Sequence, residues 1–597
     1  MTTQASSCRS SMRYPFRKKH ALALFAMLLF VCALWMLRQE EVLSKELSTS
    51  SVQEVQVNLM YPVGEGQYRK EQQRIVLEQQ QQSFEQDVGP VETKRGNYRK
   101  VASKTREASV KELIVPPQDE QKPSKKKNSV NKKVEKLKKK RAKAKKFREE
   151  ISEVPELSPV EMEEFQGRMK EYCNPPWEPV NGEEGQVNED YELHHVHVIA
   201  RHGDRTPMTQ FNIPDITVDT DFNCNLETAR EKLPSSTLLS RFLASIMAQE
   251  EALGGWPLMP WFLRKLPIGG AARRCGMAQL TPTGWLQHMK LGERLRQAYT
   301  SKLVPHRAYF RNPNMTRFKS TINSRTQQSA FAFMFGFLPR LELRHGEWLK
   351  AADNFLFCPS NWNCSCPAYS RLEKSKQQLY SAVQKNTTEV QQLLRSVAVL
   401  LMKEPKTKSL PGITGQQEMY SALICHKKPL PCSPYGCVAQ KHLAKIVAYT
   451  DRVGRELRSN EHGPHQKLAR LSMHPLLTEI ALRMKKISHG ASNYPKFAFY
   501  SGHDVTMTPL LDALGLGEYH WPPYASNVIF EMWSKAGEFF FRVLYNGQDK
   551  TSLVRFCRKN LNADGLCPLR FFLKFVNKDN MGFFHADSFE KACQLTF

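Results

Sequence analysis

Two segments of the chain carry residue types that can transfer a phosphoryl group. The first is the loop from Arg201 to Pro207, which follows an apolar run at 196–200 and places His202 between the guanidiniums of Arg201 and Arg205. Guanidiniums bind phosphate oxygens in pairs and offset the charge on a phosphoryl group in transfer. Because the same cations lower the pKa of an imidazole, we expect His202 to stay neutral and nucleophilic in mild acid. An incidental surface histidine is a poor alternative, since Arg-His-Gly-x-Arg-x-Pro arises by chance in this length with a frequency on the order of 10⁻⁴.

The second segment is the pair His503-Asp504, which follows a strand-like run at 496–501 and begins a predicted helix through Leu514. An alkoxide is a poor leaving group near neutral pH, so hydrolysis of a sugar or alcohol phosphate requires a positioned general acid. Taken alone, a polar pair at a helix start is more often a cap than a catalytic group. In the same chain as the first segment, Asp504 is predicted to be that acid.

Strands and helices alternate around these segments. Strand-like runs lie at 194–200, 496–501 and 538–545, and a long helix is expected to begin at Pro282, with Thr281 as its cap. This alternation predicts an α/β sheet, and such sheets place ligands at the carboxyl ends of their strands. A mostly helical cap subdomain is expected within roughly 221–484. The aromatic run 331–339 is expected to form a buried helix after Arg325.

The motifs resemble those of the histidine acid phosphatases. The match covers the loop motif at 196–207, Leu280–Gly284, Ser324–Thr326 and Ser501–Asp504, in the family's order and with no motif residue missing. The resemblance implies the histidine phosphatase fold, a central mixed β-sheet flanked by helices with a mostly helical cap. It implies catalysis through a phosphohistidine, without a cofactor or metal.

The resemblance also implies a role for each motif residue. His202 would be the nucleophile and Asp504 the proton donor. Three arginines and the distal histidine would hold the phosphate: Arg201, Arg205, Arg325 and His503. We therefore predict six catalytic or phosphate-binding residues and no metal ligand.

Within this family the chain most closely resembles the 2-phosphoxylose phosphatase branch, from about Cys173 to the C-terminus. The likeness includes segments without catalytic duty, such as Gly336–Pro339 and Leu544–Gly547. It implies removal of the 2-phosphate from xylose in the linkage region of proteoglycans, which permits glycosaminoglycan elongation. Two alternatives stay open: a broad or inositol-phosphate acid phosphatase of the same family, and a non-catalytic, membrane-tethered polyanion-binding protein. The His503-Asp504 pair argues against the inositol-polyphosphate branch, whose members vary that motif.

An uncharged apolar run, 21–37, indicates a single membrane-spanning signal anchor. Basic residues precede it and acidic residues follow it, so residues 1–20 are expected in the cytoplasm and the catalytic domain in the lumen, a type II topology. A cleaved signal peptide is the alternative, but no small-residue cleavage pattern follows Leu37. So short a span suits thin early-secretory membranes and favours the Golgi.

Residues 38–170 are predicted to form a largely disordered stem, rich first in Gln and then in Lys. The chain's formal charge is +27, and the segment 122–148 alone has fifteen Lys and Arg against one Glu. Such a run is also typical of nucleic-acid binding, but no nucleic acid is available behind a luminal anchor. Residues 171–597 are expected to form the catalytic domain.

Twelve cysteines lie beyond the anchor, which suggests up to six disulfides in an oxidising compartment. Their spacing does not match structural zinc sites. Three Asn-x-Ser/Thr acceptors, Asn314, Asn363 and Asn386, also fit a luminal location. The neighbouring histidines 194, 195 and 197 are expected to pack or face solvent, since 195 and 197 share one strand face while 194 points away.

Overall fold

The computed structural model describes residues 154–596, apart from 179–181, 210–212, 214, 232, 234–236, 253–274, 304–314, 339, 341–348, 352–365 and 518–519. The expected cytoplasmic tail, the anchor at 21–37 and the stem up to residue 153 lie outside these residues, as do Asn314 and Asn363. Asn386 is the last residue of α9 (Pro367–Asn386). Among the helices described, none combines the length and apolar character that a membrane crossing requires.

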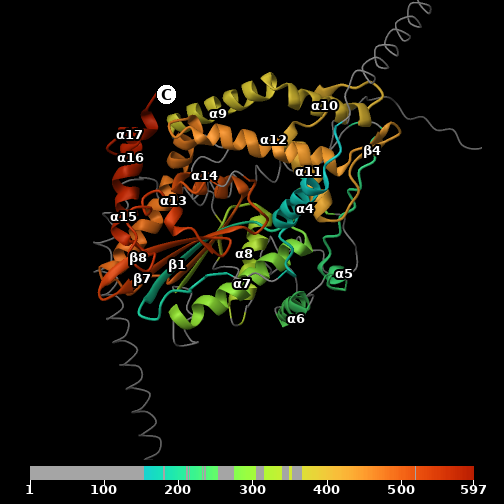
Figure 1. Ribbon diagram of the computed structural model, residues 1–597. Coiled ribbons are helices and arrows are strands. Elements are labelled where there is room, and N and C mark those ends of the chain that lie inside the picture. The colour runs from blue at the N-terminus through green and yellow to red at the C-terminus, as the bar shows by residue number, and fades with distance from the viewer. Residues whose placement is uncertain are drawn as a thin grey trace, which may run out of the picture. The chain divides into compact units, whose positions relative to one another are not determined.

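A mixed β-sheet forms the centre, as predicted (Figure 1). Its strands follow the order β10-β8-β7-β1-β6-β2-β3. The central strand β1 (Glu192–Arg201) is parallel to β6 (Phe497–Gly502) and antiparallel to β7 (Asn527–Lys535). The parallel side continues with β2 (Thr316–Ser320) and β3 (Leu349–Ala351); the antiparallel side continues with β8 (Glu538–Tyr545), to which β9 (Gln548–Asp549) and β10 (Cys567–Pro568) pair.

Helices cover both faces of this sheet, because alternate side chains of each strand point to opposite faces. Val196 and Val198 of β1 pack in the core formed with α7 (Pro282–Leu303) and α8 (Ser324–Phe337). Ile199 packs on the other face, in a core formed by three helices: α13 (Pro464–Ser488), α14 (Asp504–Leu514) and α15 (Leu569–Lys574). The predicted helix start at Pro282 and the buried aromatic helix after Arg325 are both confirmed.

A further hydrophobic core lies among helices beyond the sheet layers (Figure 1). It is formed by α4 (Pro159–Cys173), α10 (Thr388–Leu401), α11 (Ile413–Cys425) and α12 (Gln440–Ser459), and α9 packs beside them. The interval 221–484 is too broad for this cap, because it also contains β2, β3, α7, α8 and α13, which belong to the sheet layers. Helical periodicity identifies a buried face but not the layer against which that face packs.

The ordered region begins before residue 171, the expected start of the catalytic domain. Ser158 caps α4 in a capping box with Glu161, and Phe165, Met169 and Tyr172 are buried in the helical core. The stem boundary at residue 170 is therefore too late. A helix that carries only three large buried residues gives a weak apolar pattern, which explains why composition placed it in the stem.

The remaining elements are short, apart from α6. They are α5 (Leu226–Arg230), α6 (Thr237–Ala252), η5 (Thr407–Ser409), β4 (Cys432–Ser433), β5 (Gly436–Cys437), η6 (Thr551–Leu553), η7 (Phe575–Asp579), α16 (Asn580–Gly582) and α17 (Phe589–Gln594). Among the described cysteines, disulfides join Cys173–Cys425, Cys224–Cys275, Cys366–Cys593, Cys432–Cys437 and Cys557–Cys567. Cys358 and Cys364 lie outside the described residues.

Candidate active site

The two predicted catalytic segments meet at the carboxyl ends of β1 and β6. These strands are parallel, and their register pairs Arg201 with Gly502. The backbone N–H of His202 donates to the Gly502 carbonyl at 2.8 Å, and the ring centroids of His202 and His503 lie 5.5 Å apart. Residues about 300 positions apart in sequence thus become neighbours because adjacent parallel strands end at the same edge of the sheet.

The ring of His202 is oriented by its own loop. Its Nδ1 lies 2.7 Å from the Gly203 carbonyl oxygen, and the ring is buried. A carbonyl only accepts, so Nδ1 carries the hydrogen and the lone pair of Nε2 remains for attack. Burial, followed by the charges of Arg325, Arg201 and Arg205, lowers the pKa of His202 well below its ordinary value. A neutral imidazole in mild acid is the state that a nucleophile requires.

Three buried or largely buried arginines surround this ring. Arg201 donates from Nη1 to the Pro522 carbonyl at 2.5 Å, and Arg205 donates from Nη1 to Glu418 Oε1 at 2.5 Å. Within the described residues, Arg201 Nε and Nη2, Arg205 Nε and Arg325 Nε are buried and lack a hydrogen-bond partner. Buried donors are normally paired, so converging unpaired guanidinium donors indicate an anion-binding site.

The electrostatics of the arginines differ. Burial, then the charge of Arg205, lowers the pKa of Arg325 to about 10. For Arg205, burial acts to lower the pKa, but Tyr524 and Glu418 outweigh burial, so the pKa is raised above its ordinary value. The pKa of Arg201 is also raised, because Tyr172 and Asp504 outweigh its burial. All three guanidiniums therefore remain charged in the neutral and acidic range.

His503 is bound by two side chains, one at the start of α8 and one just before it. Arg325 Nη2 lies 3.3 Å from His503 Nδ1, and Thr321 Oγ1 lies 2.9 Å from Nε2. A guanidinium only donates, so Nδ1 accepts from Arg325 and Nε2 carries the hydrogen that Thr321 accepts. Asn323 Nδ2, which lies 3.2 Å from Nε2, is also a donor and makes no hydrogen bond to the ring in this tautomer. Burial, then the charge of Arg325, lowers the pKa of His503 to about 3, so this ring is neutral.

Asp504 is the first residue of α14 and is oriented from both sides. Its Oδ2 accepts from Trp521 Nε1 at 2.6 Å, and its Oδ1 accepts from the Val505 N–H at 3.0 Å. Burial raises the pKa of Asp504, but the charges of Arg201 and Arg205 outweigh burial and place it below its ordinary value. The predicted acid therefore lies in the field of the same cations as the predicted nucleophile.

The predicted catalytic loop, Arg201–Pro207, approaches α7 at a distance that only glycine permits. A Cβ on Gly203 would lie 2.4 Å from the Gly284 carbonyl oxygen, and a Cβ on Gly284 would lie 2.3 Å from the Asp204 carbonyl oxygen. The Asp204 carbonyl also accepts from the Thr281 N–H at 3.0 Å. The segment Leu280–Gly284 thus binds the loop backbone. In addition, the Asp204 N–H donates to Gln287 Oε1 at 2.7 Å.

Four site residues escaped sequence reasoning. Arg201 lies over the ring of Tyr524 at 4.4 Å and over that of Tyr172 at 5.5 Å. Trp521 binds Asp504, and Glu418 of α11 binds Arg205. No local motif marks these side chains, because the turn at 521–524 and the cap helices α4 and α11 bring them to the site.

The neighbouring histidines of β1 lie where the alternation predicted. His195 and His197 are buried on one face, with ring centroids 5.8 Å apart, whereas His194 Nε2 lies 2.7 Å from Ser534 Oγ. Burial, then the charge of Arg483, lowers the pKa of His195 to about 3. Across the described part of the chain, no group of three or more His, Cys, Asp and Glu side chains has an arrangement that could hold a metal ion.

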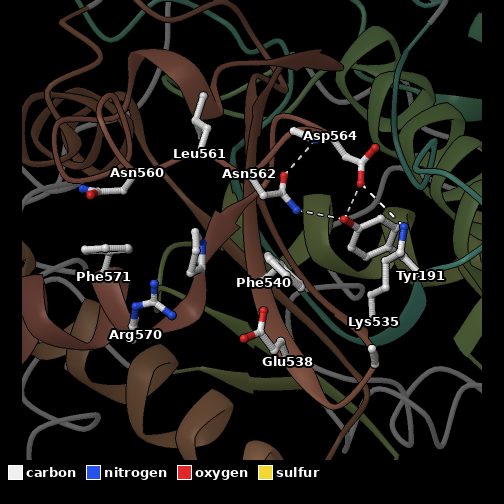
Figure 2. A pocket seen from close by; sticks show the side chains of 13 residues that line it. Tyr191, Lys535, Glu538, Phe540, Asn560, Leu561, Asn562, Asp564, Arg570 and Phe571 are labelled. Atoms are coloured by element: carbon white, nitrogen blue, oxygen red, sulfur yellow. Dashed lines mark hydrogen bonds and ion pairs between the residues drawn. The ribbon is translucent and has the colours of Figure 1, made fainter.

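A pocket of about 760 Å³ lies at the opposite end of β1, beside Tyr191 (Figure 2). The ten residues of β1 separate it from His202 by roughly 30 Å at about 3.3 Å per residue. Its polar groups bind one another: Tyr191 Oη donates to Asp564 at 2.6 Å and accepts from Asn562 Nδ2 at 2.8 Å. Lys535 pairs with Asp564 at 3.7 Å. Because the pocket lies at the far end of β1 and none of its lining residues is a predicted site residue, it is distinct from the predicted site.

Proteins of known name resemble the chain in sequence. The chain is 33% identical over 460 residues to 2-phosphoxylose phosphatase 1 of Danio rerio, a match that covers 71% of this chain and 86% of that protein. It is 32% identical to the Homo sapiens protein of the same name, covering 68% and 82%. Among solved structures, Hafnia alvei phytase in complex with tartrate aligns with a TM-score of 0.39 at 16% identity, covering 69% of this chain and 100% of that chain.

The family model of the histidine phosphatase superfamily (branch 2) matches residues 192–546, more than half of the chain. The matched interval contains both predicted catalytic segments and every strand from β1 to β8. The chain belongs to the histidine phosphatase superfamily, branch 2.

Proposed function

We propose that this protein is a phosphomonoesterase that removes the 2-phosphate of xylose in the glycosaminoglycan–protein linkage region, through a phosphohistidine at His202. The observation that carries the proposal is the convergence of buried, unpaired guanidinium donors on a neutral imidazole with a free Nε2. The relatives named 2-phosphoxylose phosphatase 1 support the choice of substrate. Removing the phosphate in this way permits glycosaminoglycan chains to elongate.

In the first step, Arg201, Arg205 and Arg325 bind the non-bridging oxygens of the phosphate. Nε2 of His202 forms a bond to phosphorus, and the bond from phosphorus to the xylose oxygen breaks. A bound phosphate competes for the Arg325 N–H that His503 Nδ1 accepts. His503 is then free to carry its hydrogen on Nδ1 and to donate it to a phosphoryl oxygen.

Asp504 supplies the proton that the departing xylose oxygen requires. Its pKa is held low by Arg201 and Arg205, and the negative phosphate offsets that field, so substrate binding raises the pKa of the acid when it must be protonated. In the second step, the Asp504 carboxylate takes a proton from water while the water oxygen attacks phosphorus. The bond to His202 breaks, and phosphate and the neutral imidazole are regenerated.

Five disulfides among the described cysteines indicate an oxidising compartment, which agrees with a secretory-pathway location. Within that pathway, we place the protein in the Golgi membrane as a single-pass type II protein, held by residues 21–37 with the catalytic domain in the lumen. The basic run 122–148 would concentrate acidic proteoglycan substrates near the membrane.

The test is hydrolysis of a synthetic linkage glycan that carries 2-phosphoxylose by the full-length protein. We expect release of phosphate and a labelled adduct on His202 after rapid quench, and neither with His202→Ala. Consumption of inositol phosphates with no action on the phosphoxylose glycan would favour the broader phosphatase. If glycosaminoglycan chains elongate to the same extent with a folded His202→Ala protein as with the wild type, the non-catalytic polyanion binder would be favoured.

A further inference from the structure

A second histidine–aspartate pair holds the catalytic loop from outside the phosphate site. Asp204 lies between His202 and Arg205 and is buried, and its Oδ2 lies 2.7 Å from Nε2 of His426. His426 is the C-cap of α11. Neither residue belongs to the set predicted to touch phosphate, so the pair calls for its own explanation.

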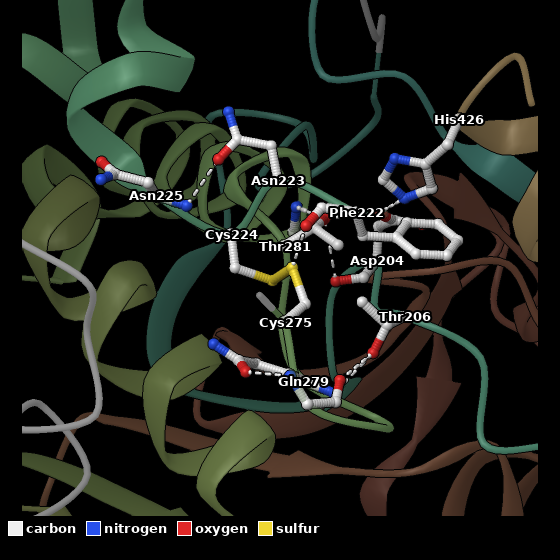
Figure 3. Close-up of a disulfide and its surroundings, with 12 residues drawn as sticks. Asp204, Thr206, Phe222, Asn223, Cys224, Asn225, Cys275, Gln279, Thr281 and His426 are labelled. Atoms are coloured by element: carbon white, nitrogen blue, oxygen red, sulfur yellow. Dashed lines mark hydrogen bonds and ion pairs between the residues drawn. A yellow bond between two sulfur atoms is a disulfide. The ribbon is translucent and has the colours of Figure 1, made fainter. Parts of the chain in front are cut away.

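Asp204 is fixed to the scaffold by its backbone N–H, its carbonyl oxygen and one carboxylate oxygen. Its N–H donates to Gln287 and its carbonyl accepts from the Thr281 N–H. Its Oδ2 also accepts from Thr281 Oγ1 (Figure 3). Its Oδ1 is buried and, within the described residues, has no hydrogen-bond partner. A buried carboxylate with one unpaired oxygen needs a nearby positive charge, and the imidazole of His426 is in direct contact with it.

The position of His426 is set by covalent and packing restraints. Cys425, the preceding residue, is joined to Cys173 at the end of α4. The ring of Phe222 contacts the imidazole edge to face at 5.0 Å, and Phe222 lies two residues before Cys224, which is joined to Cys275 (Figure 3). The imidazole is therefore held against Asp204 with little freedom to move away.

The helix α11 and its C-cap thus contact the loop at two points. Glu418 of α11 accepts from Arg205 and from the backbone N–H groups of Met208 and Thr209, and His426 binds Asp204 at the other end of the same helix. Both contacts follow His202 in the chain, one through Asp204 and the other through Arg205 and the two backbone N–H groups. A change in the charge of His426 would therefore alter the geometry of the nucleophile and of one phosphate-binding arginine.

We propose that His426 is a positioning residue that holds the catalytic loop through a charged contact with Asp204, so that turnover depends on the protonation of His426. This inference rests on the proposed function. The carbonyl end of α11 also favours a cation at this position.

The direction of the pH effect follows from the groups that face His426. Burial lowers the pKa of His426, but Asp204 outweighs burial, so the pKa is raised above its ordinary value; Lys428 opposes the shift. Lys428 itself pairs with Asp219 at 2.7 Å, and the ring of Phe222 carries no charge. Because the pKa is raised, the contact is fully charged below the ordinary value of about 6.5 and loses its charge as pH rises through the folded value.

The experiment measures kcat/KM of the full-length protein on p-nitrophenyl phosphate from pH 5 to 9. This leaving group needs little protonation, and kcat/KM excludes hydrolysis of the phosphohistidine, so most of the contribution of Asp504 is removed from the profile. We expect wild-type kcat/KM to fall as His426 loses its proton. His426→Leu should lower kcat/KM by about tenfold to a hundredfold, the usual cost of a misplaced reacting group.

Two further variants test the charge itself. His426→Gln keeps a donor to Asp204 without a titratable charge, so its activity should match the level to which the wild type falls at alkaline pH and should show no alkaline fall of its own. Lys428→Met removes the opposing cation, so the alkaline fall should move to higher pH with an unchanged plateau. If the Leu variant fails to fold by circular dichroism, these two variants decide the question.

Wild-type behaviour separates this inference from the proposed function. If the wild-type protein neither hydrolyses a phosphomonoester nor forms a phosphohistidine, the proposed function fails. If it does both, while His426→Gln retains the alkaline fall and Lys428→Met does not move it, only the role of His426 is overturned.

Discussion

Replacing Asp504 with Asn tests which residue protonates the leaving group, because the substitution removes the ionisable carboxyl group and keeps its shape. The amide oxygen of Asn can still accept from Trp521, as the carboxylate does at 2.6 Å. Asp504 makes no hydrogen bond to Arg201, Arg205 or Arg325 in the described structure, so the phosphate-binding donors stay in place. The expected loss therefore comes from general acid catalysis alone.

The size of the loss should depend on the leaving group. A positioned general acid contributes about 10²- to 10⁴-fold, which corresponds to roughly 3–5 kcal/mol at about 1.4 kcal/mol per tenfold change. We expect Asp504→Asn to lower kcat/KM by this factor for a xylose 2-phosphate and by less than about tenfold for p-nitrophenyl phosphate, whose leaving group needs little protonation. Removing an anion from beside Arg201 and Arg205 should also strengthen phosphate inhibition, since burial and these two charges set the pKa of Asp504.

The assay compares kcat/KM for the two substrates, because this ratio reports steps up to formation of the phosphohistidine and excludes its hydrolysis, in which Asp504 also acts. A matched control is Asp512→Asn, which removes a buried carboxylate from the same helix on its Arg458 side. Equal losses of kcat/KM for both substrates in Asp504→Asn would refute the assignment of Asp504 as the acid.

Four other outcomes follow from the structure. Glu418→Gln breaks a buried ion pair, so the free energy of unfolding in urea should fall by about 3–5 kcal/mol, whereas the exposed Glu404→Gln should change it by less than about 1 kcal/mol; similar values would contradict this reading. Gly203→Ala would place a Cβ 2.4 Å from the Gly284 carbonyl oxygen, so kcat should fall by about a hundredfold or more in a protein that remains folded, and wild-type kcat would show that the loop can shift freely. Because the pKa of His202 is held well below its ordinary value, the amount of phosphohistidine trapped at pH 5 should stay within about twofold of the amount trapped at pH 7. If His202 had an ordinary pKa, the neutral fraction of its imidazole, and with it the amount trapped, would fall roughly thirtyfold. Chelators should leave turnover of p-nitrophenyl phosphate intact, and strict dependence on magnesium or zinc would overturn a metal-free phosphohistidine path.

Local patterns determined which residues are predicted to carry the chemistry. His202 between two arginines, and Asp504 at a helix start after an apolar strand, could be proposed because each motif is contiguous and its residue types suit only a few reactions. The central strands and the helices at Pro282 and after Arg325 were predictable for the same reason, since periodicity and capping act over a few residues.

The tertiary structure decided which distant side chains complete the site and in what state of charge. Tyr172, Glu418 and His426 reach the loop at 201–207, and Trp521 reaches Asp504, only because helices and turns from other parts of the chain pack beside them. The edge of the cap and the start of the ordered region were likewise set by packing, which an apolar pattern does not reveal. Charge states depend on burial and on all neighbouring charges together, so the sequence identifies a histidine, whereas the fold determines whether its ring is neutral or charged.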